Sequence, residues 1–230
     1  MKRYTLVFLC MVLTVALAAG CAHKPKEEKT ARELADEGMK EFKEEDYKKS
    51  IKAFEQLRDW YPFSKYTILA DLKIADANFN MKKYKEAISA YETFERLHPR
   101  NEAVPFVIYR IGICHYNQMD TIDRDQTPAK KAIETFTRLR GQYPDSEYAE
   151  KAAEPLKECR ISLAGHELYV GRFYFKSEHY KAALARFLTV VDKYPDVGDV
   201  EAARDYIQRC HEAMTDKPEP DTAPETENSK

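Results

Sequence analysis

Histidine and acidic side chains are the residues of this sequence that could do acid–base or metal chemistry. The six histidines stand at positions 23, 98, 115, 166, 179 and 211, and none belongs to an HExxH motif or another close metal-binding pattern. His166 and Glu167 are adjacent, but their place in a helical pattern favours structural packing over a role as general base. The sequence also has no GxSxG, P-loop or GxGxxG motif. We therefore predict a protein that is not an enzyme and needs no metal or cofactor.

Cysteine is the remaining residue type with reactive chemistry. Cys10 and Cys21 belong to the N-terminal segment, which leaves Cys114, Cys159 and Cys210. Their spacing fits neither a zinc site nor a CxxC redox motif, and each lies in a predicted helix. We expect buried, small apolar side chains, and the sequence leaves open whether two of them form a disulfide.

The N-terminus resembles the signal of a bacterial lipoprotein. Lys2 and Arg3 precede an apolar run that is short for a membrane span, and small residues then lead to Cys21. We predict a signal peptide over 1–20 and a covalent lipid on Cys21. Because Ala22 follows, and not Asp, we expect anchoring at the periplasmic face of the outer membrane. The alternative is an ordinary secretory signal cut near the same place, with the cysteine incidental.

Composition indicates helices and gives no sign of nucleic-acid binding. The 230 residues include 15 Tyr and 11 Phe but only 7 Gly, as expected for amphipathic helices with few tight turns. The formal net charge of −2 gives no overall attraction to nucleic acid. We assign 21–30 to a polar tether, 31–214 to the folded domain and 215–230 to a disordered tail rich in Pro, Glu and Thr.

One pattern occurs four times in the folded domain. Each copy has residues at positions 1, 5, 8 and 11 that share one helical face, a small residue at position 4 and a proline at position 16. The copies span 47–62, 84–99, 129–144 and 180–195. In three of them a small residue also stands 12 positions before the small residue of the copy, as Gly38 does before Ser50. This spacing predicts pairs of closely packed helices.

Helix pairs of this kind are typical of tetratricopeptide repeats, which stack into a solenoid. We therefore predict an all-α solenoid of four to five pairs, with an N-terminal half at 31–144 and a C-terminal half at 145–214. Two irregularities interrupt the repeat: a polar insertion at 119–128, and a long helix over 146–176 that we expect to bend near Pro155. A helix over 199–214 has no partner and is expected to cap the array.

Several aromatic residues fall outside the repeat pattern and are candidates for binding a peptide or partner. Tyrosine and tryptophan are common interface anchors because they bury a large area at low entropic cost. For any one of them, packing between repeats is the competing interpretation. The candidates are Trp60, Phe63, Tyr66, Phe79, Phe106, Tyr109 and Tyr116.

Several local motifs together resemble the BamD family of tetratricopeptide lipoproteins. The motifs are Trp60-Tyr61-Pro62-Phe63, Asp123-Arg124-Asp125-Gln126-Thr127 in the insertion, Tyr143-Pro144-Asp145-Ser146, and Ala164-Gly165-His166-Glu167. The resemblance extends from Cys21 to about Met214, and the insertion is its most discriminating part. Members of this family belong to the machinery that assembles β-barrels in the outer membrane.

The resemblance implies two binding regions. The N-terminal repeats would receive targeting segments of unfolded outer-membrane proteins, and the C-terminal repeats would dock a periplasmic domain of the barrel-forming, BamA-type subunit. It makes Arg186 the docking arginine and adds Asp123, Arg124 and Asp125 of the insertion as candidates. Other assembly lipoproteins are further candidate partners. The chain departs from the family pattern in ending with one helix where the family often has a full pair.

Two other classes of function stay open from the sequence alone. One is a repeat lipoprotein that serves pilus or secretin assembly, or cell-wall organisation, which would share the signal and the repeats but not the insertion. The other is an envelope enzyme with a helical catalytic domain, which would require a cleft of convergent ionisable groups.

Overall fold

The structure is a computed structural model that describes residues 28–215, and all regular elements within this range are helices. The helices are α2 (Ala31–Lys43), α3 (Tyr47–Trp60), α4 (Thr67–Asn80), α5 (Tyr84–Leu97), α6 (Val104–Tyr116), α7 (Thr127–Gln142), α8 (Glu147–Lys151), α9 (Ala153–Lys176), α10 (Tyr180–Lys193) and α11 (Val200–Thr215). The predicted signal peptide, the lipid-bearing Cys21 and the predicted tail beyond Thr215 lie outside the described residues. Among the described helices, none has both the length and the apolar character needed to cross a bilayer.

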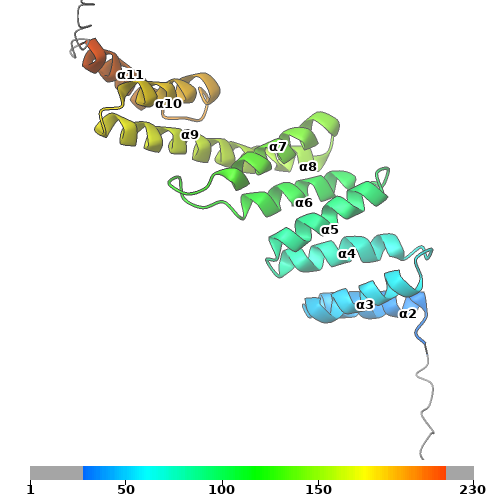
Figure 1. Cartoon of the computed structure of the whole chain (residues 1–230). Coiled ribbons are helices and arrows are strands. Elements are labelled where there is room, and N and C mark those ends of the chain that lie inside the picture. Colours follow the sequence, from blue (N-terminus) through cyan, green and yellow to red (C-terminus); the bar gives the residue numbers. More distant parts are fainter. Residues whose placement is uncertain (1–27, 216–230) are drawn as a thin grey trace, which may run out of the picture.

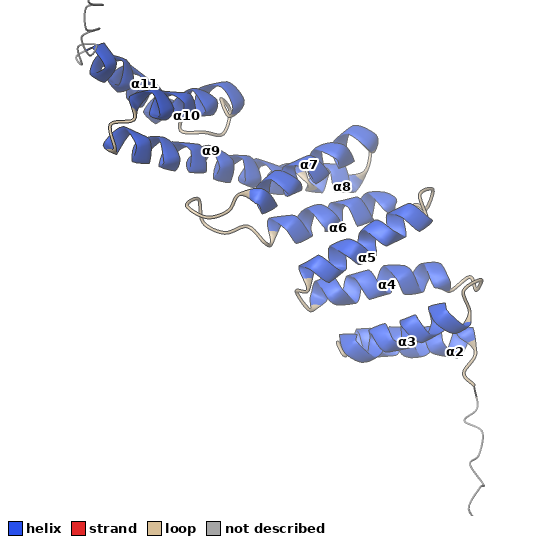
Figure 2. Cartoon of the chain, viewed as in Figure 1, coloured by secondary structure: helices blue, strands red, loops and turns tan. Residues whose placement is uncertain are grey.

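The helices stack as successive antiparallel pairs in one elongated array (Figures 1 and 2). The pairs are α2 with α3, α4 with α5, α6 with α7, and α9 with α10, and α11 follows as a single helix. Most contacts join helices that are neighbours in sequence, as in a solenoid in which each unit touches the next. This arrangement confirms the predicted tetratricopeptide solenoid.

The repeated apolar positions form the core between the pairs. Position 8 of each copy is fully buried, and so is position 11, in all four second helices. Burying a side chain of this size contributes roughly 1.5–3 kcal/mol. The residues are Phe54, Tyr91, Phe136 and Phe187 at position 8, and Leu57, Phe94, Leu139 and Val190 at position 11.

Small residues let the two helices of a pair approach closely. A Cβ atom added to Gly38 would lie 2.7 Å from the ring of Phe54, and one added to Gly171 would lie 2.6 Å from that of Phe187. Glycine is therefore required where the aromatic ring of the second helix lies on the backbone of the first. The hydroxyl of Ser50 also donates to the carbonyl of Gly38 at 2.9 Å, so the close approach is hydrogen-bonded as well as packed.

One turn geometry joins the helices of three pairs and explains the constant separation of 12 residues. Glu45, Lys82 and Glu178 have φ values of 60°, 58° and 60°, which is left-handed backbone. Around Glu45, the amide of Asp46 donates to the carbonyl of Glu41, and the same bond recurs in the other two turns. This is the Schellman arrangement that ends a helix and fixes the direction of the next one.

The two predicted irregularities are both present. The insertion is the connection between α6 and α7, which is visible as a long loop in Figure 1. The long C-terminal helix divides at Ala152 into α8 and α9, three residues before Pro155 and not at the proline itself. Proline cannot donate to the carbonyl four residues earlier, that of Lys151, so the helical hydrogen bonding is interrupted there.

The cysteines and the last helix fill structural roles. Cys114, Cys159 and Cys210 are buried and unpaired, as expected for small apolar side chains. Burial raises the pKa of both the Cys114 and the Cys159 thiols to about 12, which makes them unreactive at neutral pH. In α11, Tyr206 stacks on Phe187 with ring centroids 4.8 Å apart, while much of the outer face is polar, as a cap requires.

Candidate functional site

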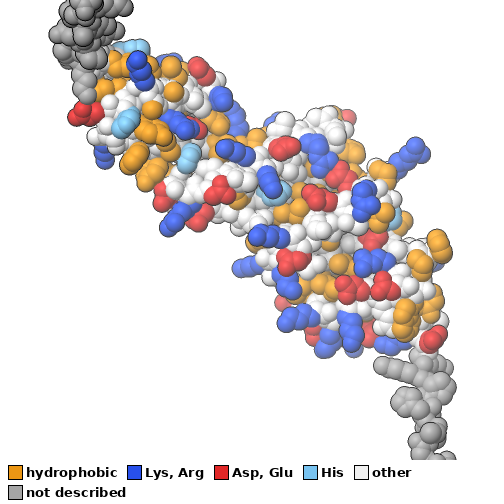
Figure 3. Space-filling view, viewed as in Figure 1, with side chains coloured by type: hydrophobic (Ala, Val, Ile, Leu, Met, Phe, Trp, Pro, Cys, Tyr) orange, Lys and Arg blue, Asp and Glu red, His pale blue; other side chains and the backbone are white. Residues whose placement is uncertain are grey.

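The first candidate surface lies at the connection between α3 and α4. Trp60 is 51% exposed and Phe63 is 101% exposed, and Ile68 nearby on α4 is 40% exposed. We call these three residues the N-terminal apolar surface, and apolar side chains gather at this edge of the molecule in Figure 3. A group of exposed apolar side chains is a typical feature of a surface that binds a protein or ligand.

The entry of the chain into the fold lies beside this surface. The hydroxyl of Tyr61 donates to the backbone carbonyl of Lys29 at 2.8 Å, immediately before α2 begins. The first helix is then fixed by a capping box between Thr30 and Glu33. The segment that leads back towards Cys21 therefore begins next to Trp60 and Phe63.

The other predicted aromatic candidates are half-buried in contacts between helices. Tyr66 packs on the core of the first repeat, and Tyr109 lies against Phe136 and Tyr148. The hydroxyl of Tyr116 donates to Glu158 on α9, and this bond raises the pKa of Tyr116 to about 12. These positions combine packing between repeats with partial exposure, so their binding role stays a prediction.

Basic side chains lie over aromatic rings that belong to the first helix of the preceding pair. The ammonium of Lys73 on α4 lies 4.8 Å from the ring centroid of Phe42 on α2. The guanidinium of Arg110 on α6 lies 4.1 Å from that of Phe79 and 5.1 Å from that of Phe106. Cation–π contacts of this kind hold neighbouring pairs together on one face of the array.

Arg186, the predicted docking arginine, takes part in an ion pair within the chain. Its Nη1 lies 3.0 Å from Oε2 of Glu167 on α9, and its side chain is 41% exposed. The pair links α9 to α10 across the C-terminal half. A partner carboxylate would therefore share this guanidinium with Glu167.

The insertion folds back onto α9. Nδ1 of His166 is 2.6 Å from the carbonyl of Ile122, and the hydroxyl of Ser162 donates to Gln126 at 3.0 Å. Ile122 also lies over Gly165, where an added Cβ would be 3.2 Å from the isoleucine side chain. Two of the motifs that carry the family resemblance, the insertion and the Gly165-His166 segment, are thus in direct contact.

The charged residues of the insertion differ in how they are used. Asp125 accepts from the amide and the hydroxyl of Thr127, the first residue of α7. Asp123 accepts from Thr121 at 2.5 Å. These hydrogen bonds lower the pKa of both carboxyls, whereas the side chain of Arg124 is 69% exposed beside Asp123. Arg124 is the member of this group most available to a partner.

A second apolar surface on α9 was not predicted from the sequence. Ile161, Tyr169 and Phe173 are 45%, 49% and 62% exposed and lie at helical spacings of eight and four residues. We call them the C-terminal apolar surface, and apolar side chains gather over the C-terminal end of α9 in Figure 3. Their spacing is that of one helical face, a signal that the mixture of core residues on α9 concealed.

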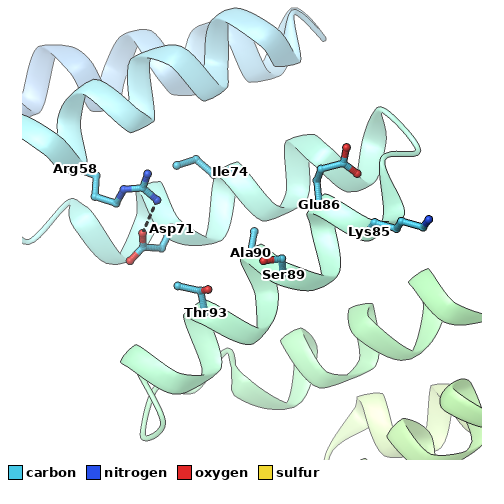
Figure 4. Close-up of a pocket in the computed structure, with 8 residues that line it drawn as sticks. All are labelled: Arg58, Asp71, Ile74, Lys85, Glu86, Ser89, Ala90 and Thr93. Carbon is cyan, nitrogen blue, oxygen red and sulfur yellow. Dashed lines mark ion pairs between the residues drawn. The ribbon is translucent and has the colours of Figure 1, made fainter.

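A cavity with a volume of about 490 Å³ lies between α3, α4 and α5 (Figure 4). Asp71 is buried in its wall, with Arg58 at 3.7 Å and Nε2 of His98 at 3.0 Å. The carboxylate of Asp71 is already paired with these two basic groups. The residues that line the cavity include the hydroxyls of Ser89 and Thr93 but no histidine. The arrangement suits an ion pair that joins helices. In the described part of the chain, acidic, histidine and cysteine side chains form no group suited to a metal ion.

Comparison with known proteins places the chain in one family. A family model named YfiO and described as an outer membrane lipoprotein matches residues 27–226. An outer membrane protein assembly factor BamD from Vibrio cholerae is 29% identical over 220 residues, which cover 90% of this chain and 89% of the relative. The corresponding protein of Pasteurella multocida is 25% identical over 224 residues, covering 93% and 85%.

A third relative is longer than this chain. The BamD of Caulobacter vibrioides is 28% identical over 194 residues, which cover 82% of this chain and 64% of the relative. The chain therefore spans less than two thirds of that protein. Because the family model covers most of its length, the chain belongs to the YfiO, or BamD, family of outer membrane lipoproteins.

Proposed function

We propose that this chain is an assembly factor for outer-membrane proteins, a scaffold that binds two partners at the two ends of its solenoid. The observation that carries the proposal is the pair of exposed apolar surfaces, one at the α3–α4 connection and one on α9. Its relatives are named as assembly factors and not as enzymes, in agreement with the prediction from the sequence motifs. The names of these relatives give no support to pilus, secretin or cell-wall assembly.

The N-terminal repeats would bind the client. An unfolded β-barrel protein offers extended segments with alternating aromatic and aliphatic side chains, and Trp60 and Phe63 offer exposed rings to bury them. Their position beside the start of the tether would place this step close to the membrane. The proposal includes a lipid on Cys21 that holds the chain at the periplasmic face of the outer membrane.

The C-terminal repeats would dock the barrel-forming, BamA-type subunit through its periplasmic domain. Tyr169 and Phe173 supply apolar contact area on α9. Arg186 and Arg124, which are 41% and 69% exposed, supply charge at its margin. An apolar centre with charged residues around it is the common form of a protein interface.

Affinity purification of the full-length lipoprotein from detergent-solubilised membranes tests this proposal. We expect a barrel-forming assembly subunit to co-purify, and depletion of the lipoprotein to lower the amount of folded β-barrel proteins in the outer membrane. Recovery of the lipoprotein without such a subunit under mild conditions, and barrel levels that depletion leaves unchanged, would contradict the proposal. A Cys21→Ser variant serves as the control for the anchor, because it cannot carry the thioether-linked lipid.

A further inference from the structure

Arg110 on α6 is held between two aromatic rings. Its guanidinium carbon is 4.1 Å from the ring centroid of Phe79 and 5.1 Å from that of Phe106. Phe79 belongs to α4, so the rings come from two successive helix pairs. Stacking on two rings limits the orientations of the guanidinium plane, but it leaves the in-plane N–H groups without acceptors.

No acceptor within the described chain uses these N–H groups. Among residues 28–215, Arg110 forms no hydrogen bond and no ion pair. Its Nε is closed off from solvent without a partner, whereas the two terminal Nη atoms are not closed off. The N–H groups on the two terminal nitrogens are therefore the donors that an acceptor from outside the chain could reach.

The preceding repeat has the same arrangement of cation and ring. Lys73 on α4 lies over Phe42 as Arg110 lies over Phe79, and in each case the ring is 31 residues before the cation. The two cations are themselves 37 residues apart, which is the separation of the first two repeat prolines. Arg110 and Lys73 thus occupy equivalent positions.

The two positions differ in their counter-ion. Lys73 donates to Asp76, three residues further along α4, at 2.8 Å. The residue three positions after Arg110 is Ile113, so the equivalent carboxylate is missing from α6. Asp76 itself is buried and also accepts from the hydroxyl of Tyr91 at 2.7 Å, so its oxygens are already occupied.

We propose that the terminal nitrogens of Arg110 bind a carboxylate of the client peptide, which serves Arg110 as the counter-ion that Asp76 is for Lys73. A carboxylate is the planar anion that accepts two parallel hydrogen bonds from one guanidinium. The ring of Tyr148 lies 5.4 Å from Phe106 and 5.8 Å from Tyr109, so an aromatic cluster adjoins the site. This cluster suits an aromatic residue next to the carboxylate in the ligand. The inference rests on the proposed peptide-binding role.

Peptide affinity measured with the full-length lipoprotein in detergent tests the inference. The probe is a fluorescent ten-residue peptide of alternating aromatic and polar residues, made with a free C-terminal carboxylate, with a C-terminal amide, and as the amide with one internal glutamate. We expect Arg110→Gln to weaken binding of the free-acid form by about tenfold or more, since it removes a charge-assisted bidentate contact. The amide without glutamate should bind the two proteins equally.

The controls test whether the effect is specific to Arg110, and whether the carboxylate is that of a side chain or of the peptide C-terminus. Arg140→Gln removes an exposed arginine from α7 and should leave all three affinities unchanged. Arg110→Lys keeps the charge over the rings but loses the two-pronged donor, so it should restore only part of the affinity. If Arg110→Gln also weakens binding of the glutamate-containing amide, Arg110 binds a side-chain carboxylate and does not require the C-terminal carboxylate of the peptide.

A second measurement decides the inference if the peptides do not bind. Binding of N-acetyl-phenylalanine should shift the Nε–H resonance of Arg110 in an NMR titration, and N-acetyl-phenylalanine amide should not. If no peptide binds but this shift occurs, the peptide role of the N-terminal repeats fails and the carboxylate site stands. If Arg110→Gln folds and binds the free-acid peptide as tightly as the wild type, the inference is overturned. If no peptide binds and the resonance does not move, both proposals fall.

Discussion

At the scale of single residues, most polar side chains that the sequence marks as candidates also have a partner inside the fold. Arg186 pairs with Glu167, Asp125 accepts from the first amide of α7, and the ring of His166 lies within hydrogen-bonding distance of the carbonyl of Ile122. The presence of a residue in a family motif therefore does not show whether that residue docks a partner or positions helices. Experiments at these positions must measure stability and binding together.

Reversing the ion pair of Arg186 separates its two roles. Arg186→Glu places a second carboxylate beside Glu167, and we expect a loss of about 1 kcal/mol of stability together with loss of partner binding, since partly exposed pairs contribute at most about that much. In the double variant Arg186→Glu with Glu167→Arg, the ion pair can form again. Thermal stability should then recover while co-purification of the partner does not. Recovery of both would confine Arg186 to a role within the fold.

The carboxyl of Asp125 should make stability depend on acid pH. Hydrogen bonds from Thr127 lower its pKa below the ordinary value of 3.8 in the folded state. Its stabilisation is therefore present above pH 3.8 and is lost as the pH falls through the folded value. Asp125→Asn keeps an acceptor for Thr127 but cannot titrate, so its melting temperature should fall less than that of the wild type between about pH 5 and pH 2. Parallel pH profiles in circular-dichroism melts would be evidence against this role.

At the scale of helices and turns, the repeat could be predicted because its core positions recur at fixed spacings. Phe54 and Phe187 take equivalent places, and a glycine faces each ring. The docking of the insertion on α9 could not be predicted in this way. Its contacts join residues 36 and 44 positions apart, and a single long-range contact leaves no periodic trace in a sequence.

The unpaired charge of Arg110 could have been found in the sequence. Aligning the first helices of the repeats sets Lys73 and Asp76 against Arg110 and Ile113, and the lost acid is visible at once. What the alignment does not contain is the position of the guanidinium between Phe79 and Phe106, which depends on how the pairs stack.

Because α9 and α10 approach closely at Gly171, this position should not tolerate a side chain. A Cβ there would be 2.6 Å from the ring of Phe187, so Gly171→Ala should lower the free energy of unfolding by about 1–3 kcal/mol through overpacking. Gly141 on α7 is the matched control, because an added Cβ meets nothing within 4 Å. Gly141→Ala should be neutral or stabilising by up to about 1 kcal/mol. Urea unfolding of both variants gives the comparison, and equal effects would refute this account of the helix pair.

Left-handed turn residues offer sites for stabilisation. Glu45 has a φ of 60°, a conformation that costs a residue with a side chain about 1–2 kcal/mol and glycine far less. We expect Glu45→Gly to raise the stability of the fold by up to about 1 kcal/mol, since glycine also loses more entropy on folding. Glu55→Gly, an equally exposed change within α3, should instead cost about 1 kcal/mol. Thermal unfolding that ranks the two variants in the opposite order would show that the turn is not strained.

At the scale of the whole molecule, the array separates the two exposed apolar surfaces and connects them through packed helices. The guanidinium of Arg138 on α7 makes a two-pronged pair with Glu95 on α5, with Nη2 to Oε2 at 3.1 Å. Arg160 on α9 similarly reaches Asp196, beyond α10, with Nη2 to Oδ1 at 2.6 Å. The first of these ion pairs joins two helices that are not neighbours in sequence, and the second joins α9 to the loop after α10. Under the proposed function, a client bound at one end and an assembly partner bound at the other would be held in a defined relation.

The most direct test of this two-ended scaffold compares two matched variants in one preparation of the full-length lipoprotein. Phe63→Glu and Phe173→Glu each place a charge on a highly exposed ring position, 101% and 62% exposed, so neither should unfold the protein. Both the affinity for the free-acid client peptide and the co-purification of the barrel-forming subunit are measured. The account predicts that Phe63→Glu weakens peptide binding by about tenfold while keeping the subunit, and that Phe173→Glu does the reverse. Folded variants that each retain both activities, or each lose both, would contradict it.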